Sequence, residues 1–393
     1  MEDLKTPDKS AADLWEKADR STGEAERLTA KPLTYGKDVW RRFRARKSAL
    51  VGMVLILFLL IFAILGPMLS SHNYYDQNLA YVNTPPVFTV YRIGDCNYYL
   101  TSSLKLLEVS PDGTLLDTVP KTSEDMAKKR ILYTLDDGGS YYLDYSSAPA
   151  RLTDAEGSTV QNTLTMRNKV FALGTDNLGR DLFTRLMYGA RISLAVAFIA
   201  AVVNLLIGII YGSISAYAGG MVDNIMMRIV DIINTIPLTL YVILIMVLLN
   251  NSGLTSIVIA LGLVYWVNMA RVVRGQILTL KQQEFVYASR TMGSSTAYIV
   301  LRHLIPNAMG PIIVTVTMLI PQAIFIEAFM SFIGLGVSAP MASWGTMCND
   351  ALESLRSSPY QLFFPALAIC IAMFAFNFVG DGLRDALDPR MRK

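Results

Sequence analysis

The most informative part of the chain is Glu284-Phe-Val-Tyr-Ala-Ser-Arg-Thr-Met-Gly-Ser-Ser-Thr-Ala-Tyr-Ile-Val-Leu-Arg-His-Leu-Ile-Pro-Asn307, because it is polar and helix-forming yet stands between two strongly apolar runs. Two short helices are predicted around Gly293, with Ser294 and Ser295 as candidate caps of the second. Such a polar segment is not stable in hydrocarbon, so we expect it to protrude from a membrane. Basic residues within it and just upstream favour the cytoplasmic side. They are Arg271, Arg274, Lys281, Arg290, Arg302 and His303.

The composition is that of a polytopic membrane protein. Of 393 residues, 52% are hydrophobic and only 17% are charged, which is typical of a chain with several apolar spans. The net charge of +3 is small, so no nucleic-acid partner is expected. The three cysteines form no C-x-x-C pair and the two histidines are far apart, so no metal site is expected. A Cys96–Cys348 disulfide is compatible with the topology, but unpaired thiols are the default.

Six apolar runs are long enough to span a bilayer. They are 49–69, 192–217, 222–249, 254–270, 310–335 and 361–379. Pro237 is expected to kink the third run. The first 36 residues hold no apolar run, so no cleavable signal peptide is expected. The basic stretch 40–47 predicts a cytoplasmic amino terminus, and six spans return the basic carboxyl end to the same side. We therefore expect a multi-pass protein of the cytoplasmic membrane with both termini inside.

The long stretch between the first two spans is expected to form a small, mainly β domain outside the cytoplasm. Turn signals at 110–113, 136–139 and 154–157 separate short alternating runs such as 114–119 and 130–135, which read as strands. No catalytic group of Ser, His and Asp stands out in it. We therefore expect this insert to dock or to shield, or to be an insertion without a specific function.

These observations predict a division of the chain into five parts. They are a cytoplasmic segment 1–48, a first transmembrane helix 49–70, an extracytoplasmic insert 71–172, a core 173–380 with a cytoplasmic loop at 272–307, and a cytoplasmic tail 381–393. In this arrangement Arg180, Arg185 and Arg191 lie outside, against the positive-inside trend. We accept this exception because the trend is statistical and the cytoplasmic loops carry more positive charge.

Several blocks of the sequence resemble the permease subunits of binding-protein-dependent ABC importers of the dipeptide, oligopeptide and nickel group. The blocks are 174–181, 223–237, 274–286, 302–307, 332–336 with 343–345, and the ending 380–390. The resemblance covers about 35–70 and 170–393, is strongest to the second permease of the pair, and says nothing about the insert. It implies an all-α polytopic protein with the six transmembrane helices of the type I ABC importer permease fold.

The resemblance also implies a function and a set of partners. The chain would be a permease subunit and not an enzyme, and it would import peptides, or alternatively nickel chelates or other small solutes. Its partners would be a second homologous permease, two ATP-binding subunits, a substrate-binding protein and membrane lipid. The sequence has no G-x-x-x-x-G-K-[ST] phosphate loop, so ATP and Mg would bind to the partner ATPases and no cofactor is expected here.

Two rival interpretations belong to other classes of protein. A self-sufficient secondary transporter would show inverted repeats with broken helices and charged residues at the membrane midplane. No such repeat is visible in the sequence. A membrane-anchored sensor would act through the β insert, and deletion of the insert would separate that reading from the permease reading.

In the family that this sequence resembles, the loop between spans four and five carries a coupling helix with the pattern Glu-Ala-Ala-x3-Gly and a later Pro. Here Gly293 and Pro306 match, whereas Tyr287-Ala288-Ser289 replaces Glu-Ala-Ala. Gly293 permits the chain reversal that makes a compact knob. The residues to which the resemblance assigns ATPase coupling are Glu284, Phe285, Ala288, Ser289, Gly293, Arg302, His303 and Pro306.

Polar residues near or within the spans are candidates for the transport pathway or for helix packing. Glu327 and Asn377 stand in apolar runs, where a polar group is costly unless it is paired or faces a cavity. For Glu327 the alternative is a structural hydrogen bond to Ser331 or to a partner subunit. Three charged residues near the inner face are expected to fix helix packing and the coupling groove. They are Asp223, Arg228 and Asp231. No catalytic residue is expected.

Overall fold

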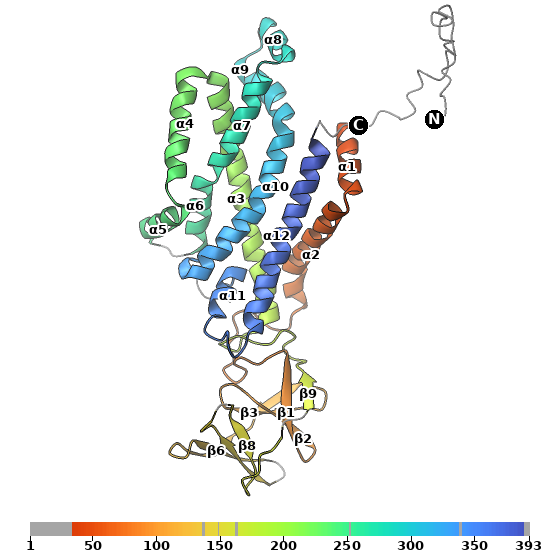
Figure 1. The fold of residues 1–393 in the computed structure, drawn as a ribbon, viewed down its shortest axis with the longest axis vertical. Coiled ribbons are helices and arrows are strands. Elements are labelled where there is room, and N and C mark those ends of the chain that lie inside the picture. Colours follow the sequence, from red (N-terminus) through yellow and green to blue (C-terminus); the bar gives the residue numbers. More distant parts are fainter. Residues whose placement is uncertain are drawn as a thin grey trace, which may run out of the picture.

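The computed structural model describes residues 34–388, except 136–137, 148, 162–163, 251–252 and 338–339. Residues 1–33 of the predicted amino-terminal segment and 389–393 of the predicted tail therefore lie outside the described residues. The described chain forms a bundle of long helices with a β domain at one end (Figure 1). We call this the β end, and we call the opposite end, where α8 lies, the α8 end.

The chain enters the bundle through two helices that meet at Arg46. Helix α1 (Tyr35–Ala45) precedes the strongly apolar helix α2 (Lys47–Leu69). Phe43 of α1 is buried in a small cluster with Ala386, so α1 is held against the last helix of the chain. The segment that was predicted to act as a topology signal is thus an ordered helix at the α8 end of the bundle (Figure 1).

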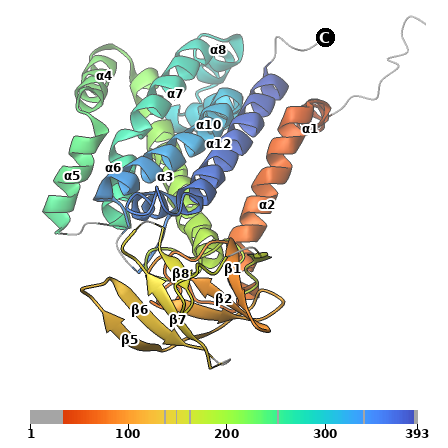
Figure 2. The ribbon, with the colours of Figure 1, turned by 60° about the horizontal axis from the view of Figure 1, so that its bottom comes forward.

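The insert folds as two antiparallel sheets (Figure 2). One sheet has the strand order β4-β3-β2-β1-β9 and the other has the order β5-β6-β7-β8. The strands are β1 (Val87–Ile93), β2 (Cys96–Leu100), β3 (Leu106–Val109), β4 (Leu115–Thr118), β5 (Lys121–Asp125), β6 (Arg130–Thr134), β7 (Ser140–Asp144), β8 (Arg151–Thr153) and β9 (Leu164–Arg167). The predicted strands at 114–119 and 130–135 are confirmed as β4 and β6.

The remaining helices form the core of the bundle. They are α3 (Leu182–Ala218), α4 (Gly220–Thr235), α5 (Leu238–Leu249), α6 (Leu254–Val264), α7 (Trp266–Leu280), α8 (Glu284–Thr291), α9 (Thr296–Tyr298), the π-helical η2 (Ile299–Leu304), α10 (Ile305–Met330), the π-helical η3 (Ser331–Leu335), α11 (Trp344–Asp350) and α12 (Tyr360–Leu387). Among the described residues, five helical segments are long and apolar enough to cross a bilayer, and α4 with α5 makes a sixth if the bent pair is one span.

The bend between α4 and α5 measures 86° and falls at Pro237, where a kink was predicted. It is far sharper than a simple kink because the residue before the proline, Ile236, leaves the helical conformation altogether (φ −84°, ψ 127°). A proline ring disfavours the α conformation of the residue before it. The apolar run 222–249 is therefore two helices joined at a sharp bend and not one kinked helix.

Helices continue beyond three of the predicted bounds. Within the predicted loop 272–307, α7 continues to Leu280 and helical structure resumes at Thr296. The second short helix after Gly293 is only the first turn of a continuous helical segment that reaches Leu335. The tail 381–393 begins inside α12, which ends at Leu387. Polar residues can extend a helix beyond the membrane at no hydrophobic cost, so hydropathy alone marks its ends poorly.

The three cysteines are free. Cys96 lies in β2 and is partly buried, Cys348 is buried in α11, and Cys370 is exposed on α12. The default of unpaired thiols therefore holds, and the alternative Cys96–Cys348 disulfide is absent.

Candidate functional site

The α8 segment, residues 281–306, projects from the end of the bundle opposite the β domain (Figure 1). Helix α8 ends in a tight reversal at Gly293, whose φ is +79°. The amide of Gly293 donates to the carbonyl of Arg290 (2.9 Å), and the amide of Ser294 donates to that of Ser289 (3.1 Å). This pair of bonds is a Schellman motif, which requires a left-handed residue after the helix. Glycine adopts that conformation without a steric penalty, so Gly293 fixes the shape of the projection.

Helix α8 is anchored on its inner face. Val286 is fully buried in an apolar cluster with residues of α7 and η2 such as Ile277 and Leu304. The Arg290 guanidinium lies 5.4 Å from the ring centroid of Tyr217, at the end of α3, within the range of a cation–π contact. These contacts anchor α8 on the helix bundle.

Ser289 differs from what its place in the motif suggested. It is only 3% exposed, and its hydroxyl has no hydrogen-bond partner among the described residues. Its small side chain therefore lets α8 pack closely on its own bundle, and it is not available at the outer surface. Glu284, Phe285, Ala288 and Gly293 are exposed.

The outer face of the α8 segment carries large apolar side chains that nothing in the described chain covers. Phe285, Tyr287, Met292, Tyr298 and Leu301 are all exposed, and Met292 is 79% exposed. Several large apolar side chains exposed on one polar projection are typical of a protein–protein interface. The predicted site residues did not include Tyr287, Met292, Tyr298 or Leu301, although large apolar residues in a polar loop are a usable signal.

The second half of the segment is shaped by Pro306. Proline has no N–H, and its ring clashes with the carbonyl four residues earlier, here that of Arg302. The chain responds with the wider π-helical turns of η2, in which the amide of Ile305 donates to the carbonyl of Val300. Arg302 and Pro306 are exposed, whereas His303 is half-buried beside Tyr298, with ring centroids 5.5 Å apart. Pro306 therefore sets the path by which the segment re-enters the bundle.

Ion pairs connect α4 to α7 near the α8 end. Arg274 of α7 binds Asp223 of α4 through two nitrogen–oxygen contacts of 2.6 Å, and the Ser215 hydroxyl also donates to Asp223. Farther along, Arg271 of α7 binds Asp231 at 2.9 Å, and Arg228 approaches Asp231 at 3.9 Å. Asp223 and Asp231 thus cross-link the two helices, while Arg228 is largely exposed. This geometry suits a packing role for the two aspartates, and the role of Arg228 stays a prediction.

Glu327 is fully buried at the junction of α3, α10 and the α11 region. The hydroxyls of Ser193 and Ser331 each donate to its carboxyl group at 2.8 Å. The predicted structural hydrogen bond to Ser331 is therefore confirmed, and the second donor comes from another helix. A buried and hydrogen-bonded carboxyl group holds helices together and does not line an open pathway. Asn377 is half-buried on α12 and has no hydrogen-bond partner within the described part of the chain, so its role stays a prediction.

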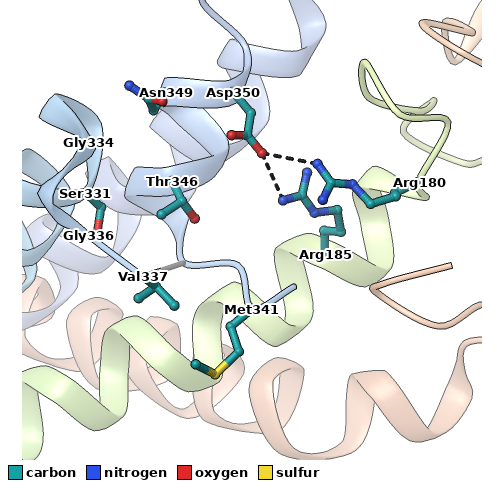
Figure 3. Close-up of a pocket in the computed structure, with 10 residues that line it drawn as sticks. All are labelled: Arg180, Arg185, Ser331, Gly334, Gly336, Val337, Met341, Thr346, Asn349 and Asp350. Atoms are coloured by element: carbon teal, nitrogen blue, oxygen red, sulfur yellow. Dashed lines mark hydrogen bonds and ion pairs between the residues drawn. The ribbon is translucent and has the colours of Figure 1, made fainter. Parts of the chain in front are cut away.

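A second polar centre lies at the β end, where the loop before α3 meets α11. Asp176 binds Arg180 Nε at 2.7 Å and also accepts from Arg185. Both arginines reach Asp350 of α11, at 3.2 and 3.1 Å (Figure 3). The four groups are two acids and two bases, and the arginines are nearly fully buried. The two acids therefore neutralise the charges of Arg180 and Arg185 locally.

We call these four charged residues, Asp176, Arg180, Arg185 and Asp350, the β-end cluster. It borders a small cavity of about 210 Å³ between α3, η3 and α11 (Figure 3). Glycines allow the backbones to approach there. A Cβ on Gly345 would lie 2.5 Å from the carbonyl oxygen of Ala328, and φ of Gly334 is +85°. The sequence block 332–336 with 343–345 therefore serves close packing of α11 on α10.

Comparison with known proteins identifies the class of this chain. Residues 204–393 match the family described as the binding-protein-dependent transport system inner membrane component, and residues 34–86 match the N-terminal transmembrane domain of oligopeptide transport permease C. The chain is 41% identical over 380 residues to the oligopeptide transport system permease protein OppC of Bacillus subtilis, covering 97% of this chain and 98% of that protein. It is 39% identical over 371 residues to the dipeptide transport system permease protein DppC of the same organism, covering 94% and 90%.

Among solved structures, the chain is similar to the inward-facing MetNI methionine ABC transporter. The TM-score is 0.45 at 19% identity, over 52% of this chain and 96% of that chain.

This chain therefore belongs to the family of binding-protein-dependent transport system inner membrane components, the permease subunits of ABC importers. The resemblance seen in the sequence is confirmed. So is the fold class, a polytopic helical permease with a small β region before its core helices. As a permease subunit, the chain is not an enzyme, and ATP hydrolysis belongs to partner subunits.

Proposed function

We propose that this chain is one of two permease subunits of an ATP-driven importer of oligopeptides or dipeptides, and that it forms half of the path through the membrane. The peptide cargo is supported by the names of the relatives over nearly the whole chain. Two ATP-binding subunits, which hold ATP and Mg, and a substrate-binding protein complete the assembly.

The observation that carries the coupling part of this proposal is the exposed apolar face of the α8 segment. Phe285, Tyr287 and Met292 project from a segment that Val286 and Arg290 hold on the bundle. An ATP-binding subunit that binds this face can therefore transmit its motion to α7 and α10. Nucleotide-driven closure of the ATPases would rock the two permeases between inward- and outward-facing states.

The basic residues support a cytoplasmic location of the α8 end. Helix α1, the α8 segment and the end of α12 lie at this end (Figure 1), and Arg41, Arg290 and Arg302 are exposed there. At the β end, Arg180 and Arg185 are paired with acids. Both termini would then lie in the cytoplasm, and the β domain would face the substrate-binding protein.

The test of this proposal replaces Met292 by glutamate in the assembled importer. A charge buried against an apolar partner surface should weaken the binding of the ATP-binding subunits by at least about tenfold, or 1.4 kcal/mol, and reduce ATP-dependent peptide uptake. Met126→Glu is the matched control, because Met126 in the β domain is 77% exposed. Unchanged co-purification of the ATP-binding subunits with Met292→Glu would contradict the proposal.

A further inference from the structure

A groove of about 940 Å³ lies between α7, α10 and the end of α12. Its lining is mainly apolar, but four amide side chains interrupt it: Asn268 and Gln276 on α7, and Asn307 and Gln322 on α10. Asn307 donates to the carbonyl of His303 at 2.6 Å, whereas the other three have no hydrogen-bond partner in the part of the chain that the structure describes. The groove therefore offers free hydrogen-bonding groups on a surface that the fold leaves open.

Two of these amides lie deep within membrane-spanning helices. Asn268 lies near the middle of the span Leu254–Leu280, and Gln322 lies well inside the span Thr296–Leu335. Both side chains are exposed on the surface of the chain. An exposed amide without a partner is unfavourable against lipid tails, because hydrocarbon supplies no hydrogen bonds. This face must therefore meet water, solute or another polar surface.

Helix α2 differs from α7 and α10 in the chemistry of its exposed side chains. Along α2, every exposed side chain from Val51 to Leu69 is apolar, including Leu57 and Phe58 near the middle of the helix. That surface is suited to lipid. The chain thus has one membrane face for lipid and another, on α7 and α10, that lipid does not fit.

We propose that the α7–α10 groove is the part of this subunit that contacts the transported solute. The side chains of Asn268, Gln276 and Gln322 would form hydrogen bonds with the backbone amides of the transported peptides. The inference rests on the proposed import function. An amide side chain both donates and accepts hydrogen bonds, so it can pair with any peptide unit whatever its side chain. The two charged residues of the lining, Arg384 and Asp388, have opposite signs and stand at the α8 end, beyond the three amides.

It follows that this half of the path accepts peptides without regard to their charge. The membrane-embedded part of the groove presents no formal charge that would repel a cationic or an anionic peptide. The predicted candidates for the pathway included Glu327, but its carboxyl group is buried and hydrogen-bonded. The neutral amides are the residues that remain accessible.

The first test introduces a charge of nearly the same shape. In the reconstituted importer, Gln322→Glu should lower the uptake of anionic peptides roughly tenfold relative to cationic peptides of equal length. Each rate is divided by the wild-type rate for the same peptide, so that selection by the substrate-binding protein cancels. Gln161→Glu, on the exposed surface of the β domain, should change all peptides equally. Equal effects of Gln322→Glu on all charge classes, or no effect, would overturn the proposal.

The second test does not depend on peptide transport. In a chain whose three cysteines are replaced by alanine, Gln322→Cys and Leu57→Cys are treated with a water-soluble thiol reagent in membranes. Cysteine reacts as its thiolate, which needs water, so position 322 should react at least roughly tenfold faster than position 57. Equal and slow reaction at both positions would overturn the proposal. If position 322 reacts fast in an importer that moves no peptide, the groove is lined by water but peptides are not the cargo.

Discussion

Replacing Asp176 by asparagine removes one charge from the β-end cluster and leaves its local turn intact. Oδ1 of Asp176 accepts the amides of Leu178 and Arg180, both at 2.9 Å, and an asparagine oxygen can keep those bonds. Oδ2 receives Arg180 and Arg185, and an NH₂ group in that place cannot. The substitution therefore isolates the ionic contribution of the cluster.

The expected loss of stability is large because the remaining charges are buried. The side chain of Asp176 is 4% exposed and that of Arg185 is 2% exposed, so water cannot replace the lost partner. Asp350 would then be the only one of the two acids left to pair with the two guanidinium groups. Breaking a buried ion pair by removing one partner costs about 3–5 kcal/mol. We expect a fall of several degrees in the Tm of the assembled importer in lipid nanodiscs, measured by the fraction that remains folded after heating.

The matched control is Asp112→Asn. Asp112 also pairs with a base, Lys169 at 3.1 Å, but both side chains are more than half exposed. An exposed pair contributes little to stability, because water screens it. The control should leave Tm almost unchanged. A comparable fall for both variants, or no fall for Asp176→Asn, would refute the reasoning that burial makes the β-end cluster a structural clamp.

Three further substitutions test local packing and the turn after α8. Gly293→Ala forces an L-residue into a left-handed conformation that costs about 1–2 kcal/mol, so we expect less uptake per ATP hydrolysed, whereas Gly275→Ala on α7 has open space around it and should behave as wild type. Gly345→Ala places a Cβ within 2.6 Å of the Ala328 backbone, so Tm should fall; an unchanged Tm would mean that α11 is not packed there. Glu327→Ala leaves two buried serine hydroxyls without an acceptor, which costs about 1–3 kcal/mol each. Glu327→Gln keeps one acceptor oxygen, so Tm should be highest for the wild type, lower for Gln and lowest for Ala.

Hydropathy and turn chemistry predicted the elements of this fold better than their ends. The apolar runs, the strands β4 and β6, and the break at Pro237 follow from short stretches of sequence whose physics is local. The 86° angle does not, because it depends on where α5 packs. The pairing of β1 with β9 was likewise beyond local patterns, since those strands are far apart in the sequence.

The candidate site shows the same division between local and tertiary information. The reversal at Gly293 was predictable, because only glycine suits its left-handed φ of +79°. The inward orientation of Ser289 was not, because the face that α8 buries is chosen by α7 and α10. The ion pairs of Arg180 and Arg185 with Asp350 were not predictable either, because Asp350 is distant in sequence.

The central claim is that the exposed face of α8 meets an ATP-binding subunit, and cross-linking from Met292 tests it most directly. Met292→Cys is introduced into the cysteine-free chain, and Met126→Cys, with similar exposure in the β domain, is the control. With a short thiol-specific cross-linker in native membranes, position 292 should be joined to an ATP-binding subunit and position 126 should not. A product between position 126 and the ATP-binding subunit, or none from position 292, would contradict the account.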